Sequence, residues 1–241
     1  MPPRASSTSR SRSPAKTPPA TRTTRSVSTK PAAGSVFLFV PNLIGYLRVV
    51  LTFVGYHYAV GDSKDYRLTV ASYMISQLLD AADGYAARKL NQSSTFGAVL
   101  DMVTDRASTT CLCVVLAHYY PKYVLGLTLL VTIDMFSHWF HMYASLLIHS
   151  RSHKTVTNPL LKFYYRKAPL FIVCAGTEMW YMSLFVLAQG ESAHGPLLGG
   201  VPFARLVFLL GTPVCAFKQV ANLVQMYVAC VGLAVHDRKQ K

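Results

Sequence analysis

Four aspartates fall within 26 residues of a mainly apolar region, and they form two pairs, Asp80 with Asp83 and Asp101 with Asp105. The members of each pair are three or four residues apart, which places them on one face of a helix. Carboxylate oxygens are the ligands that hard divalent cations such as Mg²⁺, Mn²⁺ or Ca²⁺ prefer. The spacing therefore predicts a divalent-metal site that two helices build together.

The link between the two pairs predicts how they meet. Asp80 lies eight residues before Arg88, and Asp105 lies eight residues after Gly97. At the helical rise both carboxylates are then about 12 Å from the link, so the pairs face each other at one depth. Small residues such as Gly84 let helices and a phosphate come close, and Arg88 can pair with that phosphate. Carboxylate-bound metal beside a phosphate is the arrangement that phosphoryl transfer needs.

The elements that position these carboxylates have the composition of membrane helices. The chain is 51% hydrophobic and only 14% charged, whereas a soluble domain carries about 25% charged residues. Six mainly apolar segments, each near the length that spans a bilayer, lie near 44–61, 68–88, 97–119, 122–148, 168–189 and 202–235. We predict an all-α integral membrane protein with a bundle of six transmembrane helices. Charged residues inside such helices are costly, so the four aspartates are functional candidates.

The segments outside the bundle are short. The first thirty residues hold seven basic residues and no acidic one, and without an apolar run they are predicted to be a disordered basic tail. We expect the tail to lie against anionic lipid heads; a nucleic-acid arm and a transit peptide are weaker alternatives. The stretch SVFLFVPNLIGY predicts a short interfacial helix that ends at a Pro41-Asn42 turn. The predicted divisions are a tail at 1–33, a membrane domain at 34–236 and a C-terminal tail at 237–241.

The distribution of Lys and Arg predicts the orientation in the membrane. Basic residues gather in the N-terminal tail, in the link after the second segment, in the connection after the fourth and at the C-terminus. With six spans these four regions share one side, which the positive-inside rule makes cytosolic. Both termini and the metal site are therefore predicted to face the cytosol.

A longer pattern joins both aspartate pairs and carries a family resemblance. It reads D-x₂-D-G-x₂-A-R-x₈-G-x₃-D-x₃-D, from Asp80 to Asp105. Its eight fixed positions all match the signature of the CDP-alcohol phosphotransferase family. The stretches VFLFVPNLIGYLR and DMFSHWFHMYASLL extend the resemblance over roughly residues 36 to 190, where the chain is most similar to the eukaryotic members that use inositol.

The resemblance implies roles for the aspartates and a general architecture. Asp80, Asp83 and Asp101 would bind Mg²⁺ or Mn²⁺, and Asp105 would complete a second metal site and act as general base. The family is built from six transmembrane helices, often as homodimers, and for this chain the resemblance favours the endoplasmic reticulum.

The resemblance also implies a nucleotide side. Gly84, Arg88 and Ser94 would contact the phosphates of CDP. Asn42 is a further candidate, in a family motif whose hydroxyl residue is replaced here by Gly45. The expected reaction moves a phosphatidyl group from CDP-diacylglycerol to myo-inositol, and no nucleic acid is expected as a partner.

Two alternatives to that reaction stay open. The motif identifies the CDP-linked lipid as donor but does not identify the acceptor, so serine or glycerol phosphate could replace inositol. A divalent-cation transporter could use the same acidic cluster, although a cation path gains nothing from the positive charge of Arg88 at its mouth.

Candidates for the acceptor pocket come from weaker signals. Asp134, His138 and His141 form one helical stripe, which fits a metal triad, hydrogen-bonded core residues or a lining that contacts a polyol. Glu178 lies in the middle of the fifth segment and has the same ambiguity. Lys154, in a basic connection, would contact either lipid heads or the substrate.

Overall fold

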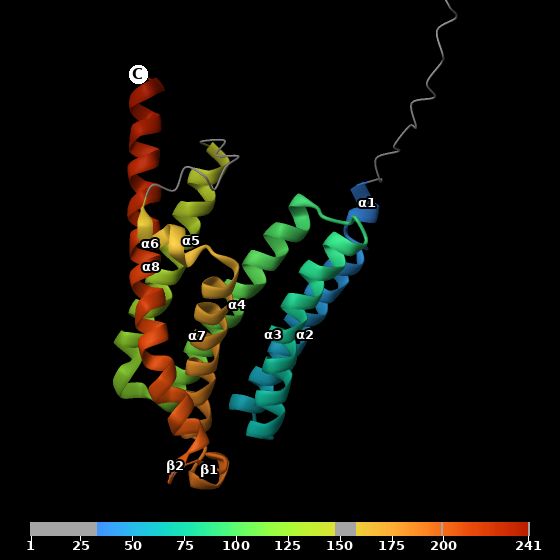
Figure 1. The fold of residues 1–241 in the computed structure, drawn as a ribbon. Coiled ribbons are helices and arrows are strands. Elements are labelled where there is room, and N and C mark those ends of the chain that lie inside the picture. Colours follow the sequence, from blue (N-terminus) through green and yellow to red (C-terminus); the bar gives the residue numbers. More distant parts are fainter. Residues whose placement is uncertain (1–32, 148–157, 199, 241) are drawn as a thin grey trace, which may run out of the picture. The chain divides into compact units, whose positions relative to one another are not determined.

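Helices occupy all six segments that the apolar pattern predicted (Figure 1). This computed structural model describes residues 33–147, 158–198 and 200–240. The long helices are α2 (Val40–Val60), α3 (Tyr66–Lys89), α4 (Thr95–Tyr119), α5 (Val124–Leu147), α7 (Lys167–Leu187) and α8 (Phe203–Gln240). The short elements are α1 (Ala33–Val36), η1 (Pro121–Tyr123), α6 (Pro159–Tyr164), η3 (Glu191–Ala193), β1 (Leu197–Leu198) and β2 (Val201–Pro202). The mainly helical class is confirmed, apart from the two-residue hairpin of β1 and β2.

The helices have the surface of an integral membrane protein. Four stretches among the described residues are long and apolar enough to cross a membrane: α2, η1 with α5, α7 and α8. Large apolar side chains such as Leu78, Val114 and Leu125 are exposed on the helices, a pattern that soluble monomers rarely show over wide areas. The helices α3 and α4 are 24 and 25 residues long and carry the four aspartates, so their charge keeps them out of that apolar set.

The helix ends differ from the predictions in two places. Pro41 and Asn42 lie in the first turn of α2 and do not end a preceding helix, because a proline in the first turn forfeits no helical hydrogen bond. At the other end α8 continues to Gln240, so most of the predicted C-terminal tail is helical. The predicted basic tail at 1–32 lies outside the described residues.

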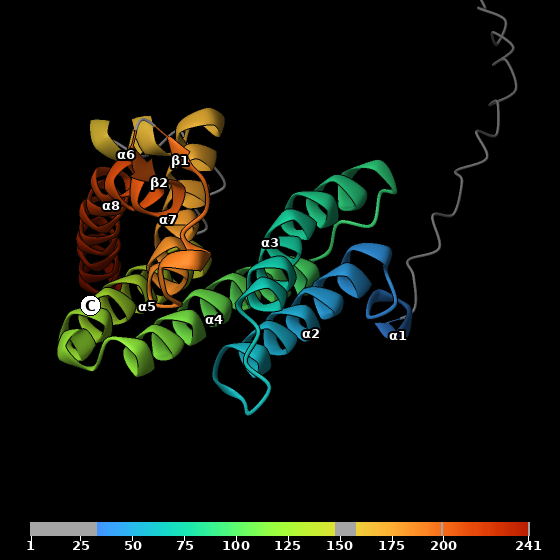
Figure 2. The ribbon, with the colours of Figure 1, turned by 90° about the horizontal axis from the view of Figure 1, so that it is seen from below.

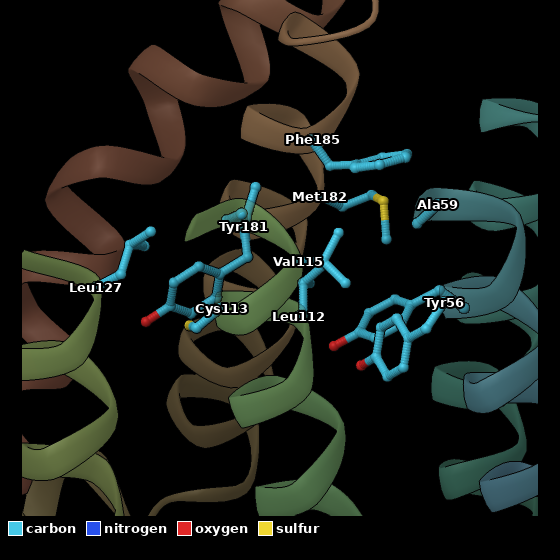
Figure 3. Close-up of a cluster of buried hydrophobic side chains, with 11 residues drawn as sticks. Tyr56, Ala59, Leu112, Cys113, Val115, Leu127, Tyr181, Met182 and Phe185 are labelled. Carbon is cyan, nitrogen blue, oxygen red and sulfur yellow. The ribbon is translucent and has the colours of Figure 1, made fainter. Parts of the chain in front are cut away.

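The long helices form two groups, α2 with α3 and α5 with α7 and α8, and α4 joins the two groups. Figures 1 and 2 show α2 running along α3, while α5 and α7 lie against α8, and α4 packs on α2 as well as on α5 and α7. A core of buried side chains from α2, α3, α4, α5 and α7 fills the space between the two groups, and Tyr56, Leu112, Met182 and Phe185 are among its members (Figure 3). This core fixes α4, which carries half of the acidic residues, between the two groups.

Candidate metal centre and its flanking cavities

The four aspartates meet around the guanidinium group of Arg48, which comes from α2. Its nitrogen atoms lie 2.7 Å from Asp80, 2.8 Å from Asp83, 2.8 Å from Asp101 and 2.5 Å from Asp105. Both carboxylate pairs thus reach one point from two helices, as the spacing predicts. Arg48 itself is only 1% exposed, whereas the side chains of Asp80 and Asp101 are 42% and 48% exposed, so a buried guanidinium meets carboxylates that solvent can still reach.

Arg48 is a site residue that the sequence reasoning missed. The backbone of Arg48 is held in place by two side chains. The hydroxyl groups of Thr52 and Ser76 donate hydrogen bonds of 2.9 and 3.0 Å to its carbonyl oxygen. A signal was available, since an arginine within an apolar segment is costly and marks a functional position by default. The spacing of residues does not predict that α2 packs on both α3 and α4, which is what brings Arg48 to the aspartates.

The carboxylates fit a hard divalent cation. One oxygen each from Asp80, Asp101 and Asp105 can lie within 4.8 Å of the others, and no other such group of three occurs in the described ranges. Asp83 is outside this group, although its Oδ2 contacts the same guanidinium. Four carboxylates against one arginine leave a formal charge of −3, which divalent cations can balance, and every donor is an oxygen.

The first of two cavities beside the carboxylates opens at the link between α3 and α4, and we call it the link cavity. It has a volume of about 160 Å³, and its lining includes Asn42, Gly84, Ser94, Asp83 and Asp101. The Asn42 side chain is 1% exposed and donates a hydrogen bond of 2.6 Å to the Val36 carbonyl. The cavity therefore joins two carboxylates to a rigidly held amide.

Two of the three residues predicted to contact phosphate, Gly84 and Ser94, line the link cavity, whereas Arg88 is not among its lining residues. Ser94 is the N-cap of α4, and its Oγ accepts a hydrogen bond of 2.9 Å from the Gly97 amide. The Arg88 guanidinium lies beside Gly84, where an added Cβ would be 3.4 Å from its Nη1. The start of a helix, an arginine and two glycines are features that suit an anion.

The second cavity borders the other two aspartates, and we call it the inner cavity. It has a volume of about 230 Å³, and its charged lining consists of Asp80, Asp105, Arg106, Glu178 and Lys218. Asp80 and Asp105 border this cavity, whereas Asp83 and Asp101 border the link cavity. The acidic cluster thus stands between two separate spaces.

Glu178 is the predicted acceptor-side residue that the structure brings to the inner cavity. Its carboxylate accepts hydrogen bonds of 2.7 Å from Tyr73 and of 2.7 Å from Thr109. These two bonds fix the side chain and leave other lone pairs for a ligand, because a carboxylate has about four acceptor positions.

The two predicted histidines are not among the residues that line the inner cavity. The Nδ1 atom of His138 lies 2.8 Å from the Asp134 carbonyl, and the His141 ring stacks on Tyr165. The stripe that joins Asp134, His138 and His141 is also not a metal-holding group among the described residues. The stripe aligns these residues on α5, but spacing alone does not say which neighbour that face meets. Lys154 lies outside the described residues.

A buried charge network next to the inner cavity is the second feature that sequence reasoning missed. Asp134 accepts hydrogen bonds of 3.0 and 2.8 Å from Arg106, and one of 3.1 Å from Asn222. Lys218 is 1% exposed, with its Nζ 3.8 Å from Asp134. Arg106 also lies 3.8 Å from Asp105, so the network reaches the acidic cluster.

Known proteins resemble the chain over most of its length. Residues 38–235 match the family model described as CDP-alcohol phosphatidyltransferase. A human protein named CDP-diacylglycerol–inositol 3-phosphatidyltransferase is 40% identical over 208 residues, 84% of this chain and 94% of its own. Proteins of the same name are 40% identical in Schizosaccharomyces pombe and 38% identical in Drosophila melanogaster, each over 86% of this chain and over 93% and 90% of their own. No solved structure matches the chain.

Proposed function

Because the chain belongs to the CDP-alcohol phosphatidyltransferase family, we propose that it transfers the phosphatidyl group of CDP-diacylglycerol to myo-inositol and releases CMP. The family membership identifies the CDP-linked donor. The choice of inositol rests on the names of relatives that are about 40% identical over most of their length.

One observation carries the proposal: the acidic cluster separates two cavities. Asp83 and Asp101 border the link cavity, and Asp80 and Asp105 border the inner cavity. A transferase needs a donor on one side of its reacting phosphorus and an acceptor on the other, roughly in line. The arrangement supports a CDP group in the link cavity and an alcohol in the inner cavity.

The link cavity offers suitable contacts for the donor. Ser94 and Gly84 border this cavity, and Gly84 leaves room for the phosphates to approach the helix. Arg88, whose guanidinium lies beside Gly84, is proposed to bind the phosphates together with Ser94. Asn42 borders the same space and is proposed to contact the nucleotide. Arg88 pairs with the phosphate charge, and this interaction persists in the departing CMP.

Asp105 is proposed as the general base, because it borders the cavity assigned to the acceptor. Its carboxylate takes the proton of an inositol hydroxyl, and the oxygen forms a bond to the phosphorus that carries diacylglycerol. The bond from that phosphorus to the oxygen of CMP breaks, and CMP leaves with the electron pair. Asp80, Asp83, Asp101 and Asp105 would hold the divalent metal, which when bound neutralises charge on the phosphate oxygens.

Glu178 is proposed to orient the acceptor. It borders the inner cavity with a carboxylate that Tyr73 and Thr109 fix in place, and a fixed carboxylate accepts hydrogen bonds from polyol hydroxyls. Of the other predicted acceptor residues, His138 and His141 face different partners, so we assign them no contact with inositol.

The membrane arrangement is also a proposal. The lengths of α3 and α4 are 24 and 25 residues, which is about 36 Å of helix and enough to cross a bilayer. Together with the four apolar stretches this supports six spans. We propose a cytosolic active site in the endoplasmic reticulum, a homodimer, and an N-terminal segment at the membrane surface, where Phe37 and Leu38 are exposed.

The decisive experiment is an acceptor screen with membranes that contain the full-length chain. We expect CDP-diacylglycerol and labelled inositol to give a labelled lipid and CMP in equal amounts, only with Mg²⁺ or Mn²⁺ present. A chelator should abolish the product, and added metal should restore it. Product from serine or glycerol 3-phosphate but not from inositol would contradict the proposed acceptor.

A divalent-cation transporter is the alternative of another class, and Arg48 argues against it. A fixed guanidinium in contact with all four carboxylates would stand in the path of a permeating cation. Vesicles that contain the chain are therefore expected to take up no more Mn²⁺ than empty vesicles.

A further inference from the structure

A buried carboxylate without a role in the proposed reaction lies behind the inner cavity. Asp134 of α5 is 6% exposed. Arg106 donates to both of its oxygens at 3.0 and 2.8 Å, and Nζ of Lys218 lies 3.8 Å from its Oδ1. In the part of the chain that the structure describes, Arg106 and Lys218 are the two basic residues that border the inner cavity, so one carboxylate holds both of them.

The charges around this cavity balance once Asp134 is included. Asp80 and Asp105 belong to the metal centre, which leaves Arg106, Lys218 and Glu178 on the rest of the wall. The positive charges of Arg106 and Lys218 are then matched by two negative charges. One belongs to Glu178, which borders the cavity, and the other to Asp134, which pairs with both cations. Among the described residues the cavity therefore offers no uncompensated cation, and burying an anion there would lack the pairing that a buried charge needs.

We propose that Asp134 is a positioning residue that makes the acceptor pocket select an uncharged polyol. By keeping Arg106 and Lys218 paired, it denies these two cations to the phosphate of a competing alcohol such as glycerol 3-phosphate. Discrimination by an unfavourable charge environment is a usual way to exclude a related ligand. The inference rests on the proposed function, and it concerns how the acceptor is chosen.

The test uses membranes that contain the full-length chain, with inositol as acceptor and glycerol 3-phosphate as added inhibitor. Asp134→Asn keeps the shape of the side chain and removes one negative charge. We expect the inhibition constant of glycerol 3-phosphate, obtained from assays at several inositol concentrations, to fall roughly tenfold in this variant, and the KM for inositol to rise by about tenfold with a smaller change in kcat. Asp134→Glu should stay close to the wild type in both measurements.

Two further variants separate the charge effect from damage to the fold. Glu178→Gln removes a negative charge on another helix, so it should also strengthen inhibition by glycerol 3-phosphate. Adding Lys218→Met to Asp134→Asn restores the balance and should weaken the inhibition again. A merely structural role for Asp134 would lower activity without any gain in binding of the anion.

The outcomes are distinguishable from a failure of the proposed function. If the wild type makes no lipid from inositol, the proposed function fails before any variant is compared. If the wild type uses inositol and neither Asp134→Asn nor Glu178→Gln strengthens the inhibition, the charge-balance inference is overturned. If Asp134→Asn does not accumulate in membranes, Glu178→Gln alone decides the result.

Discussion

Asp105 belongs to both parts of the proposed active site, because it contacts Arg48 in the acidic cluster and also borders the inner cavity. If it is the general base, Asp105→Asn removes proton transfer but keeps a side chain of the same size. We expect turnover with inositol to fall by about 10²–10⁴-fold, the usual worth of a positioned base. Binding of CDP-diacylglycerol should weaken much less, which binding and turnover assays on the same membranes can separate.

The matched control for this substitution is Asp62→Asn, at an exposed aspartate in the loop between α2 and α3. It should leave both turnover and donor binding near the wild-type values. Near-normal turnover in Asp105→Asn would refute the assignment of the base.

Arg48 balances part of the acidic cluster, so its removal has a consequence for stability. In Arg48→Met four carboxylates would share one site without their counter-charge, and their mutual repulsion should lower the stability of the fold. We expect the detergent-solubilised variant to unfold at a lower temperature in chelator than the wild type. Added Mg²⁺ should recover part of the difference, because metal supplies the missing positive charge.

The comparison residue is Arg205, which is exposed near the start of α8. Arg205→Met should unfold like the wild type with or without Mg²⁺. If Mg²⁺ raises the unfolding temperature of neither Arg48→Met nor the wild type, the carboxylates around Arg48 do not form the metal centre.

At the scale of the helices, Gly97 is the point where α4 meets α2. A Cβ at this position would lie 2.7 Å from Oδ1 of Asn42 and 3.1 Å from Oγ of Ser94, both of which border the link cavity. Gly97→Ala should therefore displace these two side chains and raise the KM for CDP-diacylglycerol by roughly tenfold, with a smaller change for inositol.

A second glycine on another helix provides the control for that substitution. Gly126 of α5 has nothing within 4 Å of an added Cβ, so Gly126→Ala should leave both KM values unchanged. Equal KM values for CDP-diacylglycerol in Gly97→Ala and the wild type would argue against a nucleotide role for Asn42 and Ser94.

The sequence predicted the helices and the carboxylate pairs well, because both depend on local spacing. A run of about 20 apolar residues predicts a helix, and gaps of three and four residues place Asp80 with Asp83 and Asp101 with Asp105 on common faces. Contacts between distant helices could not be predicted in this way. Neither the position of Arg48 among the aspartates nor the pairing of Arg106 with Asp134 follows from spacing, since each depends on which helices pack together.

For the whole molecule, the proposed topology places the links on the two sides of α3 in different compartments. Ser63 lies in the loop before α3 and Ser93 in the link after it, and both side chains are exposed. If α3 crosses the membrane, an impermeant maleimide added to sealed microsomes should label Ser93→Cys at once. Ser63→Cys should react only after the membrane is permeabilised, because that loop would face the lumen.

The wild type gives the background for this labelling, since its five cysteines all lie within the helices. The result bears on the chemistry as well as on the topology. The link at Ser93 borders the link cavity, so its exposure to the cytosol would place the proposed CDP site where a water-soluble product such as CMP can leave. If both variants reacted in sealed vesicles, α3 would not cross the bilayer, and the acidic cluster would lie at the membrane surface.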